Sequence, residues 1–293
     1  MRGGYCLNYF LKEPVMDNSD LIWHFTAPDA LYHILSPKEG LLATHQAFMN
    51  DISDCELVRR INSCYADLLD YSIDAPDSKL PRKYVELKAG LRAGTHYTIF
   101  LACFSTTQNN PLLWRCYTSN GGFAIGISKE DLTDNLDLEK YPISAIRFKP
   151  CIYSKWGKVN KMVEDIEKDF KSRFSKMKKG TAEEKAIISM ESIKQVLELN
   201  RELVFCKHPY FREEKEYRLM ISFMNPVPFS DLIVLNGKPR VRVPLKVSFS
   251  SLVKHIYVSP LGDKVSNYKL AQILASSIGL PLSSVEYKDF PIR

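Results

Sequence analysis

Residues 214–223 carry the pattern that most constrains how this chain folds, because strand alternation divides them into two unlike faces. One face is mostly apolar and consists of Lys215, Tyr217, Leu219, Ile221 and Phe223. The other face carries charge and consists of Glu214, Glu216, Arg218, Met220 and Ser222. Buried charge is costly unless it is paired. We therefore expect this row of two carboxylates and a guanidinium to have partners or a function in the sheet.

Three interpretations of the charged row are open from the residues alone. The first is a Glu-Arg salt-bridge ladder at a solvent-facing sheet edge. The second is a carboxylate aligned by arginine, able to orient a ribose hydroxyl or an attacking group as general acid/base chemistry requires. The third is a metal-dependent nuclease, because Glu213 and Lys215 have the E-x-K spacing of many such enzymes. Alternation opposes the third, since it turns the apolar face toward the metal.

The composition is that of a globular protein that lies outside membranes. Of 293 residues, 45% are hydrophobic and 25% are charged, which suffices for a full core. The seven cysteines are scattered and form no C-x-x-C pair, so we expect reduced thiols and no metal site. No apolar run reaches the roughly 20 residues of a membrane-spanning helix, and residues 1–11 lack the pattern of a signal peptide. We expect a cytoplasmic protein with no membrane partner.

The net charge of +6 gathers in residues 155–179. Such a run is typical of a solvated helix face, and it would also suit an electrostatic track for phosphates if the basic residues shared one surface. The sequence does not choose between the two.

Strands and helices are mixed along the chain. Residues 21–26 and 97–105 have the composition of strands, and a helix is predicted from Pro28 because proline suits a first helical turn. Helical periodicity predicts a further helix over 56–71. In the last third we expect strands at 216–223, 231–236, 241–247 and 253–258, a helix at 267–278 and a strand at 285–290. The predicted fold class is α+β, with a mixed, mostly antiparallel sheet.

Residues 158–206 read as almost wholly helical, with a break near Gly180. The strands before and after them each look incomplete alone. We therefore predict a single domain over 1–293, with residues 156–208 as an inserted helical pair.

His24 is the second candidate for a functional residue. A lone histidine in a strand is usually satisfied by a hydrogen bond, but Thr26 shares its predicted face and the helix from Pro28 offers N–H groups that suit phosphates. Trp114 and Tyr117 are core aromatics by default, and they also have the flat surface that a nicotinamide or nucleobase prefers. We expect the strand around His24 and the strand around Glu216 to form one site.

The order of these motifs resembles a bacterial family, family 2971 of the domains of unknown function. The resemblance extends from about Leu21 to the C-terminus. The motifs that carry it are His24-Phe-Thr26, Gly40-Leu-Leu42, Asn50-Asp51 with Glu56, Cys103-Phe-Ser105, Leu113-Trp114 with Tyr117, Gly122-Phe-Ala-Ile-Gly126, Glu214-Lys-Glu-Tyr-Arg218 and Phe290-Pro-Ile-Arg293.

That family is in turn distantly similar to the ADP-ribosyltransferase superfamily, whose pattern is a histidine on the first strand, a middle aromatic and a late glutamate. The resemblance implies the fold of that superfamily and NAD as a substrate, with no metal. It assigns NAD contacts to His24, Thr26, Ser105, Trp114 and Tyr117. Glu216, or else Glu214, would bind the nicotinamide ribose and stabilise its positive charge, with Arg218 beside it.

The implied function is transfer of ADP-ribose to a nucleic acid or a protein, in a toxin or phage-defence effector. A metal-dependent nuclease and a non-catalytic module that binds a nucleotide or nucleic acid stay as alternatives.

Overall fold

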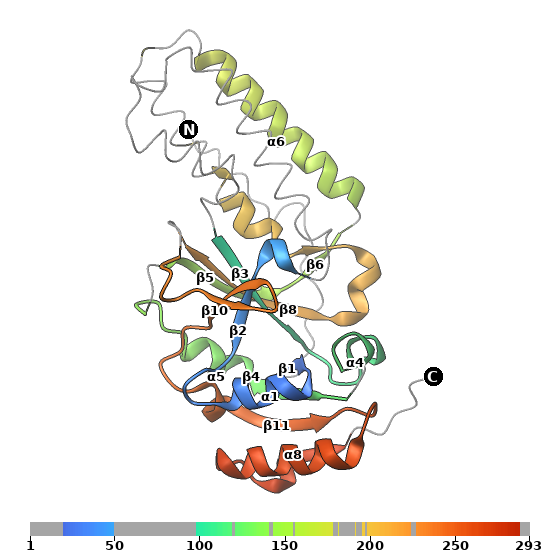
Figure 1. Cartoon of the computed structure of the whole chain (residues 1–293). Coiled ribbons are helices and arrows are strands. Elements are labelled where there is room, and N and C mark those ends of the chain that lie inside the picture. Colours follow the sequence, from blue (N-terminus) through green and yellow to red (C-terminus); the bar gives the residue numbers. More distant parts are fainter. Residues whose placement is uncertain are drawn as a thin grey trace.

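A computed structural model gives the structure of this chain (Figure 1). It describes residues 20–49, 98–118, 121–140, 143–154, 156–177, 181, 191, 195–196, 198–223 and 227–287. The helix predicted over 56–71 lies outside these residues, as do the motifs at Asn50-Asp51 and at the C-terminus.

The predicted fold class is confirmed, because helices pack on a mixed and mostly antiparallel sheet of ten strands. The strands of the sheet are β1 (Leu21–Thr26), β2 (Leu42–His45), β3 (Thr98–Ser105), β4 (Phe123–Ser128), β5 (Ile143–Pro150), β8 (Glu216–Phe223), β9 (Ile233–Leu235), β10 (Lys238–Arg242), β11 (Val253–Val258) and β12 (Val285–Tyr287). The helices with described bounds are α1 (Pro28–Leu35), α4 (Pro111–Thr118), α5 (Lys129–Asp134), α6 (Trp156–Met177) and α8 (Lys264–Ser277), with 3-10 turns η2 (Gln46–Phe48), η4 (Pro209–Glu214), η5 (Phe249–Leu252) and η6 (Leu282–Ser284). Residues 198–203 are also helical.

Strand β3 lies at the centre and organises the sheet. Along one edge it pairs with β8 over its whole length, from Thr98 opposite Phe223 to Ser105 opposite Glu216. Its other edge is shared, since β1 pairs at Ser105 and β2 pairs at Phe100 and Leu101. From β1 the sheet continues through β4 and β11 to β12, and from β2 it continues through β10 to β9. The sheet therefore splits on one side of β3.

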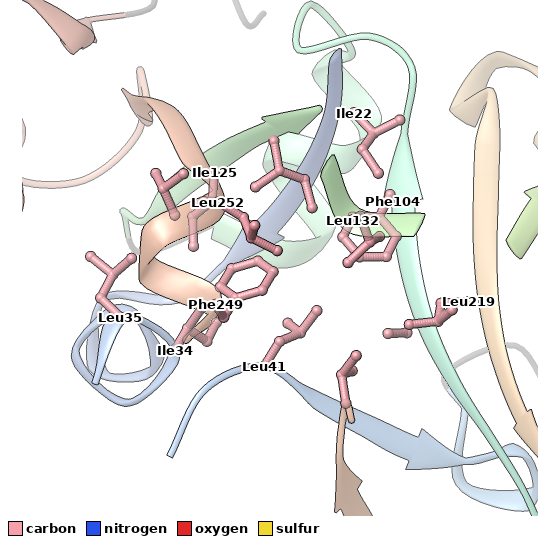
Figure 2. Packing of buried hydrophobic residues seen from close by; sticks show 14 of the residues in the cluster. Ile22, Ile34, Leu35, Leu41, Phe104, Ile125, Leu132, Leu219, Phe249 and Leu252 are labelled. Carbon is pink, nitrogen blue, oxygen red and sulfur yellow. The ribbon is translucent and has the colours of Figure 1, made fainter. Parts of the chain in front are cut away.

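The two faces of the sheet are covered by different helices. The face that we name the α1 face holds the main core, where apolar side chains of the strands meet α1, α5, α8 and η5 (Figure 2). Ile22, Phe104 and Leu219 point into it from three strands. The opposite face, the α4 face, holds a smaller cluster in which Leu113 and Trp114 of α4 pack on Trp23 and Phe25 of β1.

An inserted segment leaves the sheet after β5, and α6 extends away from the strands in Figure 1. Its two ends meet again, because β6 (Ile152–Tyr153) and β7 (Cys206–Lys207) pair in parallel. The Ile152 amide donates to the Phe205 carbonyl over 2.7 Å. This pairing places Lys207 beside the start of β8.

One strand position differs from the prediction, since β10 spans Lys238–Arg242 where residues 241–247 were expected. The cause is the pair Asn236-Gly237, whose φ angles of 52° and 71° make a two-residue turn. Asn-Gly is the strongest short-range hairpin signal in a sequence. The turn joins β9 to β10 as a hairpin and moves β10 toward the N-terminus.

Gly126 leaves the space that the Trp23 ring occupies on the neighbouring strand. A Cβ at Gly126 would lie 2.6 Å from Cζ3 of Trp23, so Gly126→Ala overpacks the sheet. We expect a loss of about 1–3 kcal/mol in unfolding free energy, measured by urea denaturation. Gly157→Ala in α6 is the control, because its Cβ would have no atom within 4 Å, and it should raise helix stability by up to about 1 kcal/mol. An equal response of the two variants would contradict this packing.

Candidate functional site

A buried cluster of charges lies on the α4 face where β8 begins. Glu216 is 6% exposed and Arg218 is 0% exposed. Arg218 Nε donates to Glu216 Oε1 over 2.8 Å, and a second guanidinium nitrogen reaches Oε2 over 3.3 Å. Arg218 Nη1 donates to the Val204 carbonyl over 2.5 Å. The predicted pairing of carboxylate with guanidinium is therefore present and buried, where the ladder interpretation placed it at a solvent-facing edge.

Lys207 joins the cluster from the inserted segment. Its Nζ donates to Glu216 Oε2 over 2.6 Å and forms a second ion pair with Glu214. The ammonium also lies 4.9 Å from the centre of the Phe211 ring. Glu214 is not part of the strand, since it ends η4 and the chain turns at Lys215 with a φ of 44°. The predicted row of Glu214, Glu216 and Arg218 is thus assembled by Lys207 and not by strand alternation alone.

The charges of the cluster act on one another. Burial would raise the pKa of Glu216, but Arg218 and Lys207 outweigh it and lower the pKa to about 2. Burial would lower the pKa of Lys207, and the carboxylate of Glu216 raises it above its ordinary value. For Glu214, burial outweighs Lys207 and the pKa is raised. Glu216 is therefore ionised at neutral pH.

Tyr117 is the predicted aromatic residue that lies near this cluster. It belongs to α4, and burial raises the pKa of its hydroxyl, with a further rise from the negative charge of Glu216. The residue as a whole is 40% exposed. The structure therefore brings α4, with the predicted Tyr117, to the same face as Glu216.

Trp114 has a different position from the one the resemblance implied. It is 0% exposed, its Nε1 donates to the Gln108 carbonyl over 2.7 Å, and its ring meets Phe25 edge-on at 4.9 Å. A ring without exposed surface offers no face to a ligand. The expectation that Trp114 stacks on nicotinamide is wrong, and Trp114 is a core aromatic.

Ser105 and Thr26 are both buried. Ser105 Oγ donates to the Glu214 carbonyl over 2.7 Å and accepts from the Thr107 amide over 3.1 Å, so its hydroxyl fixes the approach to β8. Thr26 is 7% exposed and points to the α1 face with Ile22.

His24 does not share a face with Glu216. Trp23 is opposite Ser105, and Ser105 is opposite Glu216, so these three side chains lie on the α4 face. His24, the next residue along β1, is directed to the other face by alternation. Its Nδ1 lies 2.9 Å from the Cys103 carbonyl, between the positions where β3 pairs with β1 and with β2. The expectation of one site formed by His24 and Glu216 on a common face is therefore wrong.

Three residues of the cluster were not predicted from the sequence. Besides Lys207, Cys103 lies opposite Arg218 on β3, where burial and then the Glu216 carboxylate raise the pKa of its thiol. Tyr153 accepts a hydrogen bond from the Glu216 amide at its hydroxyl over 2.8 Å. The signal available was a single lysine after the apolar run Val204-Phe205-Cys206. Such a lysine enters a core only with a carboxylate partner.

The residues of the nuclease alternative lie elsewhere. Glu213 and Lys215 precede β8 and are exposed, so the alternation argument does not apply to them. Among the described residues, no group of three or more His, Cys, Asp or Glu side chains has the arrangement of a metal site. None of the helices in these residues is long and apolar enough to cross a membrane.

Comparison with known proteins agrees with the family resemblance. The model of the family described as "Protein of unknown function (DUF2971)" matches residues 113–219, which run from α4 into β8. The matched range contains Tyr117, Lys207, Glu216 and Arg218. No curated protein and no solved structure matches the chain. The resemblance to this family is thereby confirmed over less than half of the chain.

The buried charge cluster should contribute to the free energy of unfolding. Removing one member of a buried ion pair leaves the others unpaired, so Glu216→Gln should lower the unfolding free energy at pH 7 by about 3–5 kcal/mol. The folded pKa of about 2 lies below the unfolded value of roughly 4.3, so Glu216 stabilises the fold above that value and its contribution falls as pH drops toward 2. Urea unfolding from pH 7 to pH 3 should show this slope in the wild type and a shallower slope in Glu216→Gln.

The exposed neighbour Glu213 supplies the control. Glu213→Gln should change stability by less than about 0.5 kcal/mol. If both variants lost the same amount, the cluster around Glu216 would not be a major source of stability.

Proposed function

We propose that this chain is an ADP-ribosyltransferase-like enzyme that cleaves NAD, with Glu216 as the residue that stabilises the nicotinamide ribose in the transition state. One observation carries the proposal: a buried carboxylate held by Arg218 and Lys207 lies on the same face of the sheet as α4, the helix that contains Tyr117. The implied resemblance to the superfamily supports it in part, since the late glutamate and the middle aromatic of that pattern share a face, whereas its histidine, His24, lies on the opposite face.

Cleavage of the glycosidic bond of NAD requires a carboxylate of this kind. When the glycosidic bond breaks, nicotinamide leaves with the bonding electron pair and the ribose C1′ becomes an oxocarbenium-like cation. A carboxylate that is ionised and shielded from water stabilises that cation strongly. The acceptor, a nucleic acid or a protein, then adds its nucleophile to C1′ and loses a proton. A toxin or phage-defence effector would use this reaction against its target.

The roles proposed for single residues follow the geometry. Glu216 faces the ribose and Tyr117 faces the nicotinamide ring, while Arg218 and Lys207 position the carboxylate. Glu214 is a second partner of Lys207 and is not assigned to the chemistry. His24 is not included in this site because it does not share its face.

A non-catalytic module is the second candidate, and one observation favours it. Both carboxylate oxygens of Glu216 already accept hydrogen bonds, from Arg218 at Oε1 and from Lys207 at Oε2. A carboxylate has about four lone-pair sites, so this engagement restricts its access to a ribose hydroxyl. In this alternative the cluster holds β8 to the inserted segment, and ligand binding occurs without chemistry.

Release of nicotinamide from NAD tests the proposal. With water as the basal acceptor, the wild type should release nicotinamide without any need for a divalent ion. Chromatography measures the released nicotinamide. Glu216→Gln should reduce the rate by roughly 100-fold or more, because the cation loses its counter-charge. Tyr117→Ala removes the ring without breaking the ion cluster, and should raise KM for NAD. Tyr210→Ala, which removes an 88% exposed ring in η4, is the control and should leave the rate unchanged.

Thermal melting with millimolar NAD separates the candidates further. Binding stabilises the fold by RT ln(1 + [L]/Kd), about 2.7 kcal/mol at 100 times Kd. NAD that stabilises the protein without releasing nicotinamide would support the binding module. A wild type that neither responds to NAD nor releases nicotinamide would overturn the transferase, and Lys215→Ala with added Mg²⁺ would then test the nuclease.

A further inference from the structure

Strand β10 carries three basic residues on one face of the sheet. Lys238, Arg240 and Arg242 alternate along the strand, so their side chains share a face, and we name them the basic stripe. Val241, between the two arginines, belongs to the core of the α1 face, so the basic stripe lies on the α4 face. Figure 1 shows β10 beside β2, in the part of the sheet that ends with β9.

The two arginines of the basic stripe are not neutralised by the described residues. Neither Arg240 nor Arg242 has a carboxylate partner among them, and Nε of Arg240 is buried there without a hydrogen-bond partner. Arg147 and Arg218, on other strands of the same sheet, each pair with glutamates. Burial also lowers the pKa of Arg240, and an anionic ligand would favour its charged form. A buried donor without a partner requires an explanation, and a bound anion is one.

The basic run of residues 155–179 differs in this respect from the basic stripe. Within α6, Lys168 pairs with Asp165 and Arg173 pairs with Asp169, at the spacing of neighbours on one helix surface. Charges paired in this way are typical of a solvated helix face. Strand β10 is therefore the stronger candidate for contacts with phosphate groups.

Strand β9 adds apolar side chains beside the basic stripe. Ile233 is opposite Arg240 and Leu235 is opposite Lys238, so both apolar side chains lie on the same face as the cations. Leu235 is 43% exposed. A row of cations and a row of apolar side chains thus run in parallel, at the spacing of neighbouring strands, about 4.8 Å.

From this arrangement we infer that this face of the β9–β10 hairpin binds single-stranded nucleic acid, with phosphates on the basic stripe and bases over Ile233 and Leu235. Alternate residues of a strand are about 6.6 Å apart, a repeat that suits successive phosphates of an extended single strand. A planar guanidinium matches two phosphate oxygens with parallel N–H donors. In a duplex the bases are stacked inside and would not reach the apolar row. The inference does not rest on NAD cleavage, since it uses no residue of the Glu216 cluster.

Fluorescence anisotropy of a labelled short oligothymidylate, titrated with the full chain over a range of chloride concentrations, tests the inference. Each phosphate contact to a single strand contributes about 0.7 to the slope of log affinity against log salt, so three contacts predict a wild-type slope of about −2. Arg240→Gln should weaken binding and reduce the magnitude of this slope by about 0.7, whereas Arg240→Lys keeps the charge and should keep the slope. Leu235→Ala should weaken binding without changing the slope, because it removes no charge.

Lys168→Gln is the control, because it removes one exposed cation from α6 and should leave the affinity within roughly twofold of the wild type. Arg242→Gln is a second test of the basic stripe, since this residue is exposed and its replacement should reduce the slope while the fold is kept.

Several outcomes would overturn the inference. Unchanged affinity in both arginine-to-glutamine variants would do so, as would an equal loss in Lys168→Gln, which would indicate diffuse attraction between charges. A duplex of the same length that binds as tightly as the single strand would show that the bases are not contacted. No binding by a wild type with native far-UV circular dichroism would also contradict it. The titration contains no NAD, so a failure of the proposed NAD cleavage and a failure of this surface are read separately.

Discussion

The carboxylate of Glu216 is the interaction on which this part of the molecule depends. Through Arg218 it is bound to its own strand and, by way of the Val204 carbonyl, to the end of the inserted segment. Through Lys207 it is bound to β7, which returns that segment to the sheet. Two cations and two carboxylates balance in charge, so burial is tolerated, but only while all four are in place. The same carboxylate therefore holds the fold and is the chemical centre of the proposed site, which explains why its oxygens are so fully engaged.

How much of the fold and of the site the sequence predicts depends on how far apart along the chain the residues lie that determine each feature. Alternation over 216–223 predicted the bounds of β8 and the unlike character of its faces, because a strand's side-chain period is local. The pair Asn236-Gly237 is also a local signal, and the hairpin turn that it predicts gives the correct start of β10. The role of Lys207 in the cluster was not predictable from nearby residues, because the parallel pairing of β6 with β7 across the inserted segment determines its partners. No pattern within a few residues of Lys207 specifies that pairing.

His24 illustrates the limit of reading faces from one strand. Alternation correctly separated Ile22, His24 and Thr26 from Trp23 and Phe25. It did not state which of these sets faces Glu216, because that depends on the register of β1 against β3, here set by the pair Trp23 and Ser105. A shift of one residue would have exchanged the faces. The charged residues of β8 and the histidine of β1 were each identified from sequence, while their mutual placement came from a single bridge between strands.

The split of the sheet beside β3 also explains how His24 reaches the backbone of this central strand. Along one edge, strand β3 pairs with β1 at Ser105 and with β2 at Phe100 and Leu101. The Cys103 carbonyl lies between these two pairings, and the His24 side chain bonds to it there. The side chain of the same residue lies on the α4 face opposite Arg218, where burial and then the Glu216 carboxylate raise the pKa of its thiol. Cys103 thus contacts His24 with its carbonyl, while its side chain lies beside the buried charges on the other face. A substitution at Cys103 would therefore disturb both the backbone that holds His24 and the surroundings of the Glu216 carboxylate, although these two side chains lie on opposite faces of the sheet.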